Sequence, residues 1–323
     1  MKGLTDIEGI RVGHASDFQA LTGCTVILCE GGAVAGMEVR GFASSTRATD
    51  AFRPEHLAEK VHGIVLAGGS AFGLDAVTGA MRYLERRGVG FDTGVAKVPI
   101  VAGAILFDLG MGSSAVRPTA EMGEAAAEAA TEGTVEEGSV GAGTGATVGK
   151  LFGLERAMKG GVGSATVDIA DGVRVSALAV VNAFGDVLDP SSGKPLAGAR
   201  VAPGSRELAN MAEQMKQGHV RRKFGVRTSP LNTTLVAVAT NAALNKVQAN
   251  QLAAMAQAGC ARSIAPVHTT FDGDLVFALS LGTLQADLNA LGVAAAEAVA
   301  QAIVRGVRLA RSLGGVPGLA DWQ

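Results

Sequence analysis

Runs of apolar, β-type residues dominate this sequence, and they come in groups instead of alternating one by one with helical segments. These runs cover residues 24–30, 33–39, 63–69, 97–106, 165–189, 233–240 and 273–282. Many of them are apolar at every position, which predicts strands that are covered on both faces. Two sheets packed together under outer helices would satisfy both features. The sequence therefore predicts an α+β fold with mixed or antiparallel sheets inside and helices outside.

Turn signals link some of these strands. Gly31-Gly32 and Asp171-Gly172 each separate two apolar runs, as the tight turn of a β-hairpin does. The chain has no internal repeat and no Pro- or Ser-rich linker, so we expect residues 1–323 to form a single domain.

Helical segments have recognisable starts. Ser70 precedes a helical pattern and is a candidate N-cap. Asn245 and Gln248 have the spacing of a capping box for the helix that follows. Residues 294–312 end in cations, as the last turns of a C-terminal helix often do.

Composition excludes several classes of protein. With 323 residues and 48% hydrophobic content the chain can bury a large core, and its net charge of −2 gives no basic surface for nucleic acid. No secretory leader is visible, and no charge-free apolar run approaches the roughly 18 residues of a membrane span. Cys24, Cys29 and Cys260 fit reduced structural thiols. We therefore expect a cytoplasmic protein with no membrane partner.

Two motifs invite familiar interpretations that their residues do not support. "GAGTGATVGKL" (141–151) has Thr144 and Leu151 where a phosphate-binding loop needs Gly and Ser or Thr, so no nucleotide cofactor is predicted. Its glycines could instead let the backbone approach a substrate closely, with Lys150 supplying a charge. "LAGGSAFGLD" (66–75) lacks the second Gly of a nucleophile elbow because residue 72 is Phe.

The second motif keeps two open interpretations. Gly68 and Gly69 at the start of a helix could border a site for a substrate carboxylate. Ser70 could be the nucleophile of a serine hydrolase, since triads assemble in space and cannot be excluded from a sequence. The five His are scattered with no zinc spacing, so no metal site is predicted.

A hydroxyl stands at the first position of a predicted buried strand. Asn232 and Thr233 lead directly into the apolar run 233–240. Thr is a good strand former, and that is the simplest explanation. The alternative is that the chain is cut there, because attack of the Thr233 hydroxyl on the Asn232 carbonyl would convert the amide to an ester. Water would then release Thr233 with a free α-amine.

Such an amine would activate the hydroxyl without help from a His. Its reference pKa is about 8, so a useful fraction is neutral near pH 7 and can act as the base for Thr233. Downstream, "FDGDL" places Asp272 and Asp274 on the same side of an extended chain. Two carboxylates at this spacing could orient a nucleophile or hold a metal, or they could belong to a solvated turn.

Eight stretches, spread almost from end to end, carry a family resemblance. They are "IRVGHASD", "GCTVILCEGGAVAGMEVRG", "GIVLAGGSAFGLDA", "VPIVAGAILFDL", "GAGTGATVGK", "ALAVVNAFGDVLD", "NTTLVAVATNA" and "HTTFDGDLVFAL". In this order they resemble the DmpA-type aminopeptidases (peptidase family S58). That family includes β-peptidyl aminopeptidases and 6-aminohexanoate-oligomer hydrolases, and the "NTT" motif looks most like the latter.

The resemblance implies an αββα four-layer sandwich of the N-terminal-nucleophile type. It implies self-cleavage into an α chain of residues 1–232 and a β chain of 233–323, with no cofactor and a tetrameric assembly. It also implies the following roles. Thr233 is nucleophile and base, Asn182 stabilises the oxyanion, Asp272 and Asp274 lie near the nucleophile, and Lys150 belongs to the active-site wall.

One departure and several alternatives remain. Where several members have a Tyr at the active site, this chain has Phe107 and lacks the hydroxyl. The expected activity is hydrolysis of small peptides, amino-acid amides or oligoamides through an acyl-Thr233 intermediate. The alternatives are an uncleaved, non-enzymatic binding member of the family, or a serine hydrolase that uses Ser70.

Overall fold

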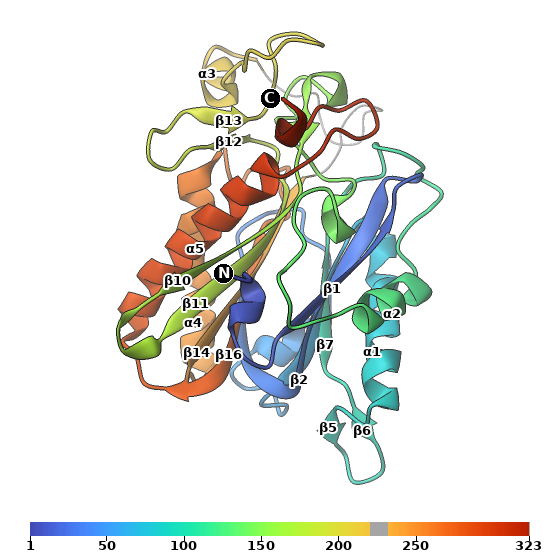
Figure 1. The fold of residues 1–323 in the computed structure, drawn as a ribbon, viewed down its shortest axis with the longest axis vertical. Coiled ribbons are helices and arrows are strands. Elements are labelled where there is room, and N and C mark those ends of the chain that lie inside the picture. The colour runs from blue at the N-terminus through green and yellow to red at the C-terminus, as the bar shows by residue number, and fades with distance from the viewer. Residues whose placement is uncertain (220–231, 323) are drawn as a thin grey trace.

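A mixed β-sheet that bends back on itself forms the centre of the molecule (Figure 1). The computed structural model describes residues 1–219 and 232–322. Within them nine strands join this sheet, in the order β10-β11-β14-β16-β2-β4-β7-β3 with β1 paired to β2. The strands are Arg11–Asp17 (β1), Thr22–Val39 (β2), Thr46–Arg47 (β3), Val61–Ala67 (β4), Val101–Ile105 (β7), Val162–Asp168 (β10), Arg174–Asn182 (β11), Thr233–Ala242 (β14) and Leu275–Leu284 (β16).

Helices and small strands complete the described fold. The α-helices are Ala76–Arg86 (α1), Ala120–Glu128 (α2), Met211–Lys216 (α3), Lys246–Ser263 (α4) and Leu288–Arg308 (α5). Shorter strands lie outside the main sheet, in two pairs and one three-stranded sheet. The pairs are Phe91–Asp92 (β5) with Lys97–Val98 (β6) and Thr147–Val148 (β8) with Met158–Lys159 (β9), and the three-stranded sheet comprises Asp186–Leu188 (β12), Pro195–Ala197 (β13) and Ile264–Ala265 (β15).

The long strand β2 connects the two halves of the sheet. Its residues 34–39 pair with β16, and its residues 24–28 pair with β4. The two halves face each other, with α4 and α5 outside one half and α1 and α2 outside the other (Figure 1). The pairs β14–β16 and β4–β7 are parallel, whereas the other pairs of the main sheet are antiparallel.

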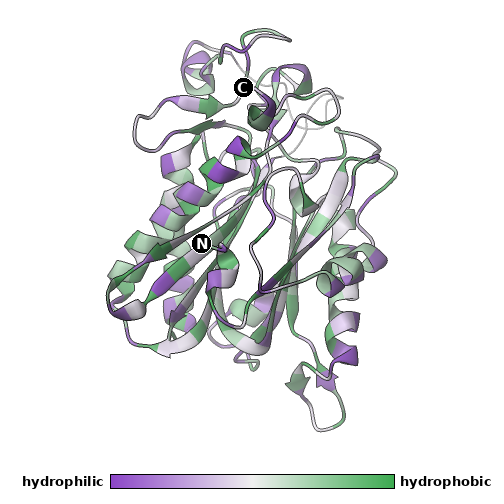
Figure 2. Ribbon diagram, viewed as in Figure 1, coloured by the Kyte–Doolittle hydropathy of each residue, from purple (hydrophilic) through white to green (hydrophobic). Residues whose placement is uncertain are grey.

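Three hydrophobic cores fill the three spaces between these four layers. On β14, Val236 and Val238 pack with α4 and α5, whereas Leu235 and Ala237 point into the core between the two sheet halves. A third core lies between α1 and α2 and the half of the sheet that they cover. Because both faces of the central strands are covered, β4, β11 and β14 are buried at almost every position, and hydrophobic residues recur along the central strands (Figure 2). The predicted αββα sandwich is confirmed.

Two local predictions were wrong. Gly31-Gly32 does not turn a hairpin, because β2 runs through it from Thr22 to Val39 with only a register shift between Leu28 and Ala33. The glycines mark a bulge, which is the other use of Gly within a strand. Ser70 is not a helix cap, because it has a left-handed φ of 56° inside a 3-10 turn, Ser70–Asp75, that precedes α1.

Other local predictions are confirmed. Asp171-Gly172 lies in the turn that joins β10 to β11 as an antiparallel pair. Asn245 and Gln248 form the capping box of α4, with both reciprocal bonds present. The C-terminal helix α5 begins six residues before the predicted 294, because Asp287 caps it at Leu288. By length and hydropathy alone α5 could span a membrane, but 72% of its most apolar window is buried inside this fold.

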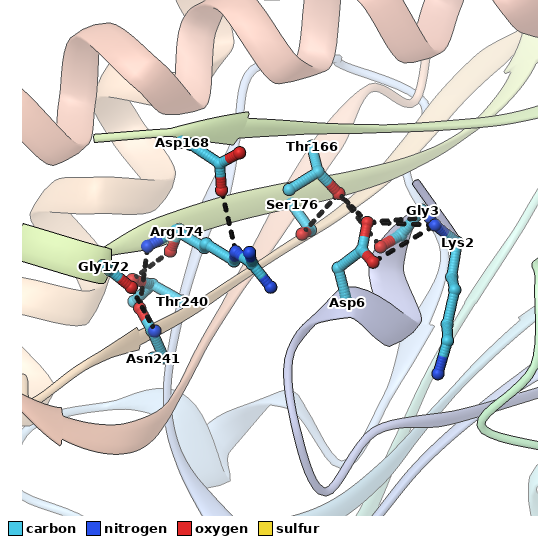
Figure 3. Close-up of polar contacts among 10 residues, drawn as sticks. All are labelled: Lys2, Gly3, Asp6, Thr166, Asp168, Gly172, Arg174, Ser176, Thr240 and Asn241. Carbon is cyan, nitrogen blue, oxygen red and sulfur yellow. Dashed lines mark hydrogen bonds and ion pairs between the residues drawn. The ribbon is translucent and has the colours of Figure 1, made fainter. Parts of the chain in front are cut away.

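The N-terminus is fixed to β10, the edge strand of the sheet half that α4 and α5 cover (Figure 3). The Asp6 carboxylate accepts hydrogen bonds from the backbone N–H groups of Lys2 and Gly3 and from the hydroxyl of Thr166 on β10. Nearby, Asn241 at the end of β14 accepts from the backbone N–H of Arg174 at the start of β11. This polar cluster lies at the end of β14 opposite to Thr233.

Close packing of α5 on β10 depends on a glycine. A Cβ at Gly163 would lie 2.0 Å from the carbonyl oxygen of Ala302 on α5. We expect Gly163→Ala to lower the free energy of unfolding by about 1–3 kcal/mol, as overpacking of a filled core does. Denaturant titration measures the change. Gly31→Ala is the control, because its Cβ would meet nothing within 4 Å. Equal midpoints for the two variants would contradict this account of the packing.

Candidate active site

Thr233 begins β14 with its hydroxyl against the carbonyl group of the preceding residue. The Oγ1 atom lies 2.5 Å from the Asn232 carbonyl oxygen, and the Gly273 N–H donates to the same oxygen over 2.8 Å. Asn232 is fully buried and Thr233 is 2% exposed. The Asn232 carbonyl is therefore polarised by a fixed backbone donor while a hydroxyl group lies beside it.

Asn182 lies directly opposite Thr233. The two are cross-strand partners in the antiparallel pair of β11 and β14. Side chains of such partners lie on the same face of a sheet, about 5 Å apart at Cβ. On that face Leu178, Val180 and Leu235 fill the core between the sheet halves. Thr233 and Asn182 thus continue this inner face at the end where the strand pair stops.

The hydrogen bonds of Asn182 fix the orientation of its amide. Its Oδ1 accepts from the Thr147 N–H over 3.0 Å and from the Lys150 Nζ over 2.6 Å. Its Nδ2 donates to the carbonyl oxygen of Phe107 over 3.2 Å. Only this orientation satisfies both sets of partners. An amide nitrogen carries two hydrogens, so the bond to Phe107 uses only one of the two that Nδ2 can donate.

Lys150 lies beside Asn182. It is 1% exposed, and its Nζ also donates to the backbone carbonyl of Asn182 over 3.0 Å. The glycine-rich segment 141–151 therefore brings a buried lysine to Asn182. Phosphate binding has no support in the sequence of this segment, and close approach of its backbone to a substrate stays a prediction.

The two acidic residues lie on the loop before β16 and contact backbone groups around Thr233 without contacting its hydroxyl. Asp274 accepts from the Thr234 N–H over 2.6 Å. Asp272 accepts from the N–H of Phe184 and from both the N–H and the hydroxyl of Thr269. Among the described residues no hydrogen bond joins either carboxylate to the Thr233 side chain.

Burial and mutual repulsion favour the neutral form of one carboxyl group. Desolvation and then the negative charge of Asp274 raise the pKa of Asp272 to about 6, although hydrogen bonds from Thr269 and Phe184 act in the opposite direction. The pair therefore changes its total charge within the pH range in which many enzymes work.

Two contacts in this region were not predicted from the sequence. The His268 Nδ1 lies 2.9 Å from the Asp274 Oδ2, and the backbone N–H of His268 points to the same oxygen over 3.2 Å. The Gly273 N–H is the other missed group, although Gly273 stands between the two aspartates in "FDGD". The sequence shows a backbone donor at every non-proline position, and it does not show which donor meets a carbonyl far away.

The glycine pair and Ser70 are not brought to Thr233 by any described contact. The Gly69 N–H donates to Asp108 over 2.7 Å, and a Cβ at Gly68 would collide with the same carboxylate. Ser70 donates its backbone N–H to Leu106. These residues reach the site only indirectly, since Asp108 follows Phe107 in the chain. Phe107 itself contributes its backbone carbonyl to Asn182.

A serine triad and a metal centre both lack support in the described residues. The Nδ1 atoms of the five histidines have hydrogen-bond partners in Thr25, Ala58, Ile100, Gln214 and Asp274, and none of these partners is Ser70. No group of three His, Cys, Asp or Glu residues in this part of the chain could hold a metal ion. The three cysteines are free and buried, as expected.

Comparison with known proteins identifies the class. A model of peptidase family S58 matches residues 2–320, so the chain belongs to that family. The chain is 40% identical to an uncharacterized aminopeptidase of Mycobacterium tuberculosis, Rv1333, over 99% of its own length and 98% of that protein. It is 30% identical to a 6-aminohexanoate-oligomer endohydrolase of Kocuria sp., over 94% of this chain and 85% of the relative.

Solved structures agree in fold. A Burkholderia sp. beta-aminopeptidase superposes with a TM-score of 0.71 and 25% identity, covering 98% of this chain and 90% of the other. The L-aminopeptidase D-Ala-esterase/amidase of Ochrobactrum anthropi, a variant of the Ntn-hydrolase fold, gives a TM-score of 0.68 at 18% identity, covering 98% and 88%. The chain is thus a hydrolase of peptide or amide bonds with an N-terminal-nucleophile-hydrolase fold.

Proposed function

We propose that the protein cleaves itself between Asn232 and Thr233 and then hydrolyses small peptides, amino-acid amides or oligoamides with Thr233 as the N-terminal nucleophile. The observation that carries this proposal is the position of the Thr233 hydroxyl, 2.5 Å from an Asn232 carbonyl oxygen that also accepts from the Gly273 N–H. Asn182 faces the same residue across the strand pair.

The proposed self-cleavage has two steps. The Thr233 oxygen attacks the Asn232 carbonyl carbon while the Gly273 N–H stabilises the charge that develops on the carbonyl oxygen. The C–N bond breaks, the hydroxyl proton ends on the departing nitrogen, and an ester joins Asn232 to Thr233. Water then hydrolyses the ester, leaving a carboxylate on Asn232 and a free hydroxyl and α-amine on Thr233.

Hydrolysis of a substrate uses the same residue. The α-amine of Thr233 takes the hydroxyl proton as the oxygen attacks the substrate carbonyl, and the Asn182 Nδ2 donates to the oxyanion. The leaving amine departs with a proton, and water then releases the acyl group from Thr233. Lys150 and Thr147 hold the Asn182 amide in the orientation that this role requires.

Substrate choice and processing are tested together. The family includes the aminopeptidases and oligoamide hydrolases named above, so the panel should contain L- and D-amino-acid amides, β-peptides and 6-aminohexanoate oligomers. Intact-mass analysis before the assay establishes whether the active species is two chains. Activity in a fully intact chain would reject the proposed nucleophile, and absence of any amidase activity would favour a binding function.

Assembly and location remain predictions. We propose a tetramer of processed units, as the resemblance implied, and size-exclusion chromatography with light scattering tests it. A cytoplasmic location is proposed from composition alone.

We expect Asp274→Asn to shift the pH dependence of activity. The neutral amine of Thr233 is the base, so activity should rise with pH through one ionisation. Removing the negative charge beside Thr234 lowers the pKa of the Thr233 amine, so the rise in activity should occur at lower pH. The pH profile of kcat/KM measures the shift in the processed protein. His268, which also faces Asp274, is unchanged in this variant.

Asp168→Asn is the matched control for this prediction. Asp168 forms an exposed ion pair with Arg174 near the opposite end of the sheet (Figure 3). Its loss should leave the profile unchanged. An identical profile for the wild type and Asp274→Asn, with normal cleavage, would remove this carboxylate from the mechanism.

A further inference from the structure

A fully buried lysine lies behind the site and has no part in the steps above. Lys159 on β9 is 0% exposed, and its Nζ donates to the backbone carbonyls of Thr144 over 2.8 Å and Ala146 over 2.6 Å. Burial lowers the pKa of this lysine to about 7, against the opposing attraction of Asp108. Lys159 is thus a titratable group enclosed within the fold.

One of the two carbonyls that Lys159 bonds belongs to the residue immediately before Thr147, which itself bonds to Asn182. Thr147 follows Ala146 and donates its N–H to the Asn182 Oδ1. The Gly160 N–H adds another bond to the Ala146 carbonyl, over 2.9 Å. Donors from Lys159 and Gly160 therefore fix the backbone from which the Thr147 N–H projects.

Asp108 holds the segment that bonds to the Nδ2 atom of Asn182, as Lys159 holds the segment that bonds to its Oδ1 atom. It follows Phe107, whose carbonyl accepts from the Asn182 Nδ2. The Asp108 carboxylate is 4% exposed and accepts from the Thr22 hydroxyl over 2.8 Å and from the Gly69 N–H over 2.7 Å. These two bonds hold Asp108 in place and so fix the neighbouring Phe107 carbonyl, which accepts the hydrogen bond from Nδ2.

The two anchored segments touch each other. A Cβ at Gly145 would lie 2.6 Å from the Asp108 Oδ2, so the loop that Lys159 holds packs directly on the carboxylate. Asp108 acts to raise the pKa of Lys159, and Lys159 acts to lower the pKa of Asp108, although burial has the larger and opposite effect on each group. One segment supplies the Thr147 N–H to the Oδ1 of Asn182, and the other supplies the Phe107 carbonyl to its Nδ2.

We infer that Lys159 is a positioning residue for the oxyanion donor, which with Asp108 fixes the two backbone segments that orient the amide of Asn182. This inference rests on the proposed role of Asn182. Lys159 touches no reacting atom and acts through the Thr147 N–H. A lysine that merely stabilised the fold would have no specific relation to Asn182.

A double-mutant cycle on the processed protein separates these possibilities. Lys159→Met should lower kcat by about 10- to 100-fold, the scale that a small misplacement of a catalytic group can produce, with KM changed much less. In the Asn182→Ala background the same substitution should change kcat less than about twofold, because the group that it positions is already gone.

Lys246→Met is the matched control. Lys246 is also buried, and its Nζ donates to the carbonyls of Ala51, Arg53 and His56 near the start of α4, at the other end of β14. Its replacement removes the same kind of bonds away from the site. It should lower the melting temperature without lowering the kcat of the folded protein.

Asp108→Asn carries the test if Lys159→Met fails to fold or to process. This isosteric change keeps an acceptor for the Gly69 N–H and removes the charge that attracts Lys159. A several-fold loss of kcat that disappears in the Asn182→Ala background supports the inference. Unchanged kcat in both folded variants, or losses that multiply with that of Asn182→Ala, would overturn it. Full activity of Asn182→Ala alone would instead reject the role proposed for Asn182.

Discussion

Thr233→Ala is expected to remain a single chain of 323 residues without amidase activity. The wild-type protein should separate on a denaturing gel into residues 1–232 and 233–323, with Thr233 as the new N-terminus. The reason is that the Thr233 oxygen, held beside the Asn232 carbonyl, is both the group that cuts the chain and the later nucleophile. Intact-mass measurement and N-terminal sequencing of the smaller fragment check this result.

Two variants sharpen this expectation. Thr233→Ser keeps a hydroxyl and should still cleave. Thr234→Ala removes the neighbouring hydroxyl, which has no hydrogen-bond partner within the described structure, and should cleave at the same bond. Cleavage of Thr233→Ala, or an intact wild-type chain with full activity, would show that the bond before Thr233 is not the site of activation.

Asn182→Ala is expected to lower kcat by roughly 10²–10³-fold, the usual loss when one oxyanion donor is removed. KM should change much less, because the donor acts mainly on charge that develops in the transition state. The variant should still cleave itself, since the Gly273 N–H serves the Asn232 carbonyl in that step. Steady-state kinetics on the processed variant measure both constants.

Asn241→Ala provides the comparison at the opposite end of β14. Asn241 also bonds to backbone groups, of Gly172 and Arg174, so its loss removes similar bonds far from Thr233 (Figure 3). Its kcat should stay close to that of the wild type. If the two variants had similar kinetics, Asn182 would be a structural residue and not an oxyanion donor.

Much of the architecture could be predicted because it depends on local patterns. Apolar residues at nearly every strand position indicated sheets covered on both faces, and the three cores have that arrangement. The capping box of Asn245 and Gln248 acts over four residues and was therefore visible. The hairpin predicted at Gly31-Gly32 was wrong, since the same dipeptide serves a turn or a bulge, and only the pairing of β2 with both β16 and β4 decides between them.

The amino-acid sequence shows which groups are available: a Thr at the start of a buried strand, an Asn at the end of another, and two closely spaced carboxylates. Long-range packing then brings some of these groups together. The register of β11 and β14 places Asn182 opposite Thr233, and a slip of one residue would turn the side chain to the other face. The Gly273 N–H and the Lys159 ammonium act on backbone carbonyls. Every residue carries such a carbonyl, so no local pattern marks those that long-range packing brings within bonding distance.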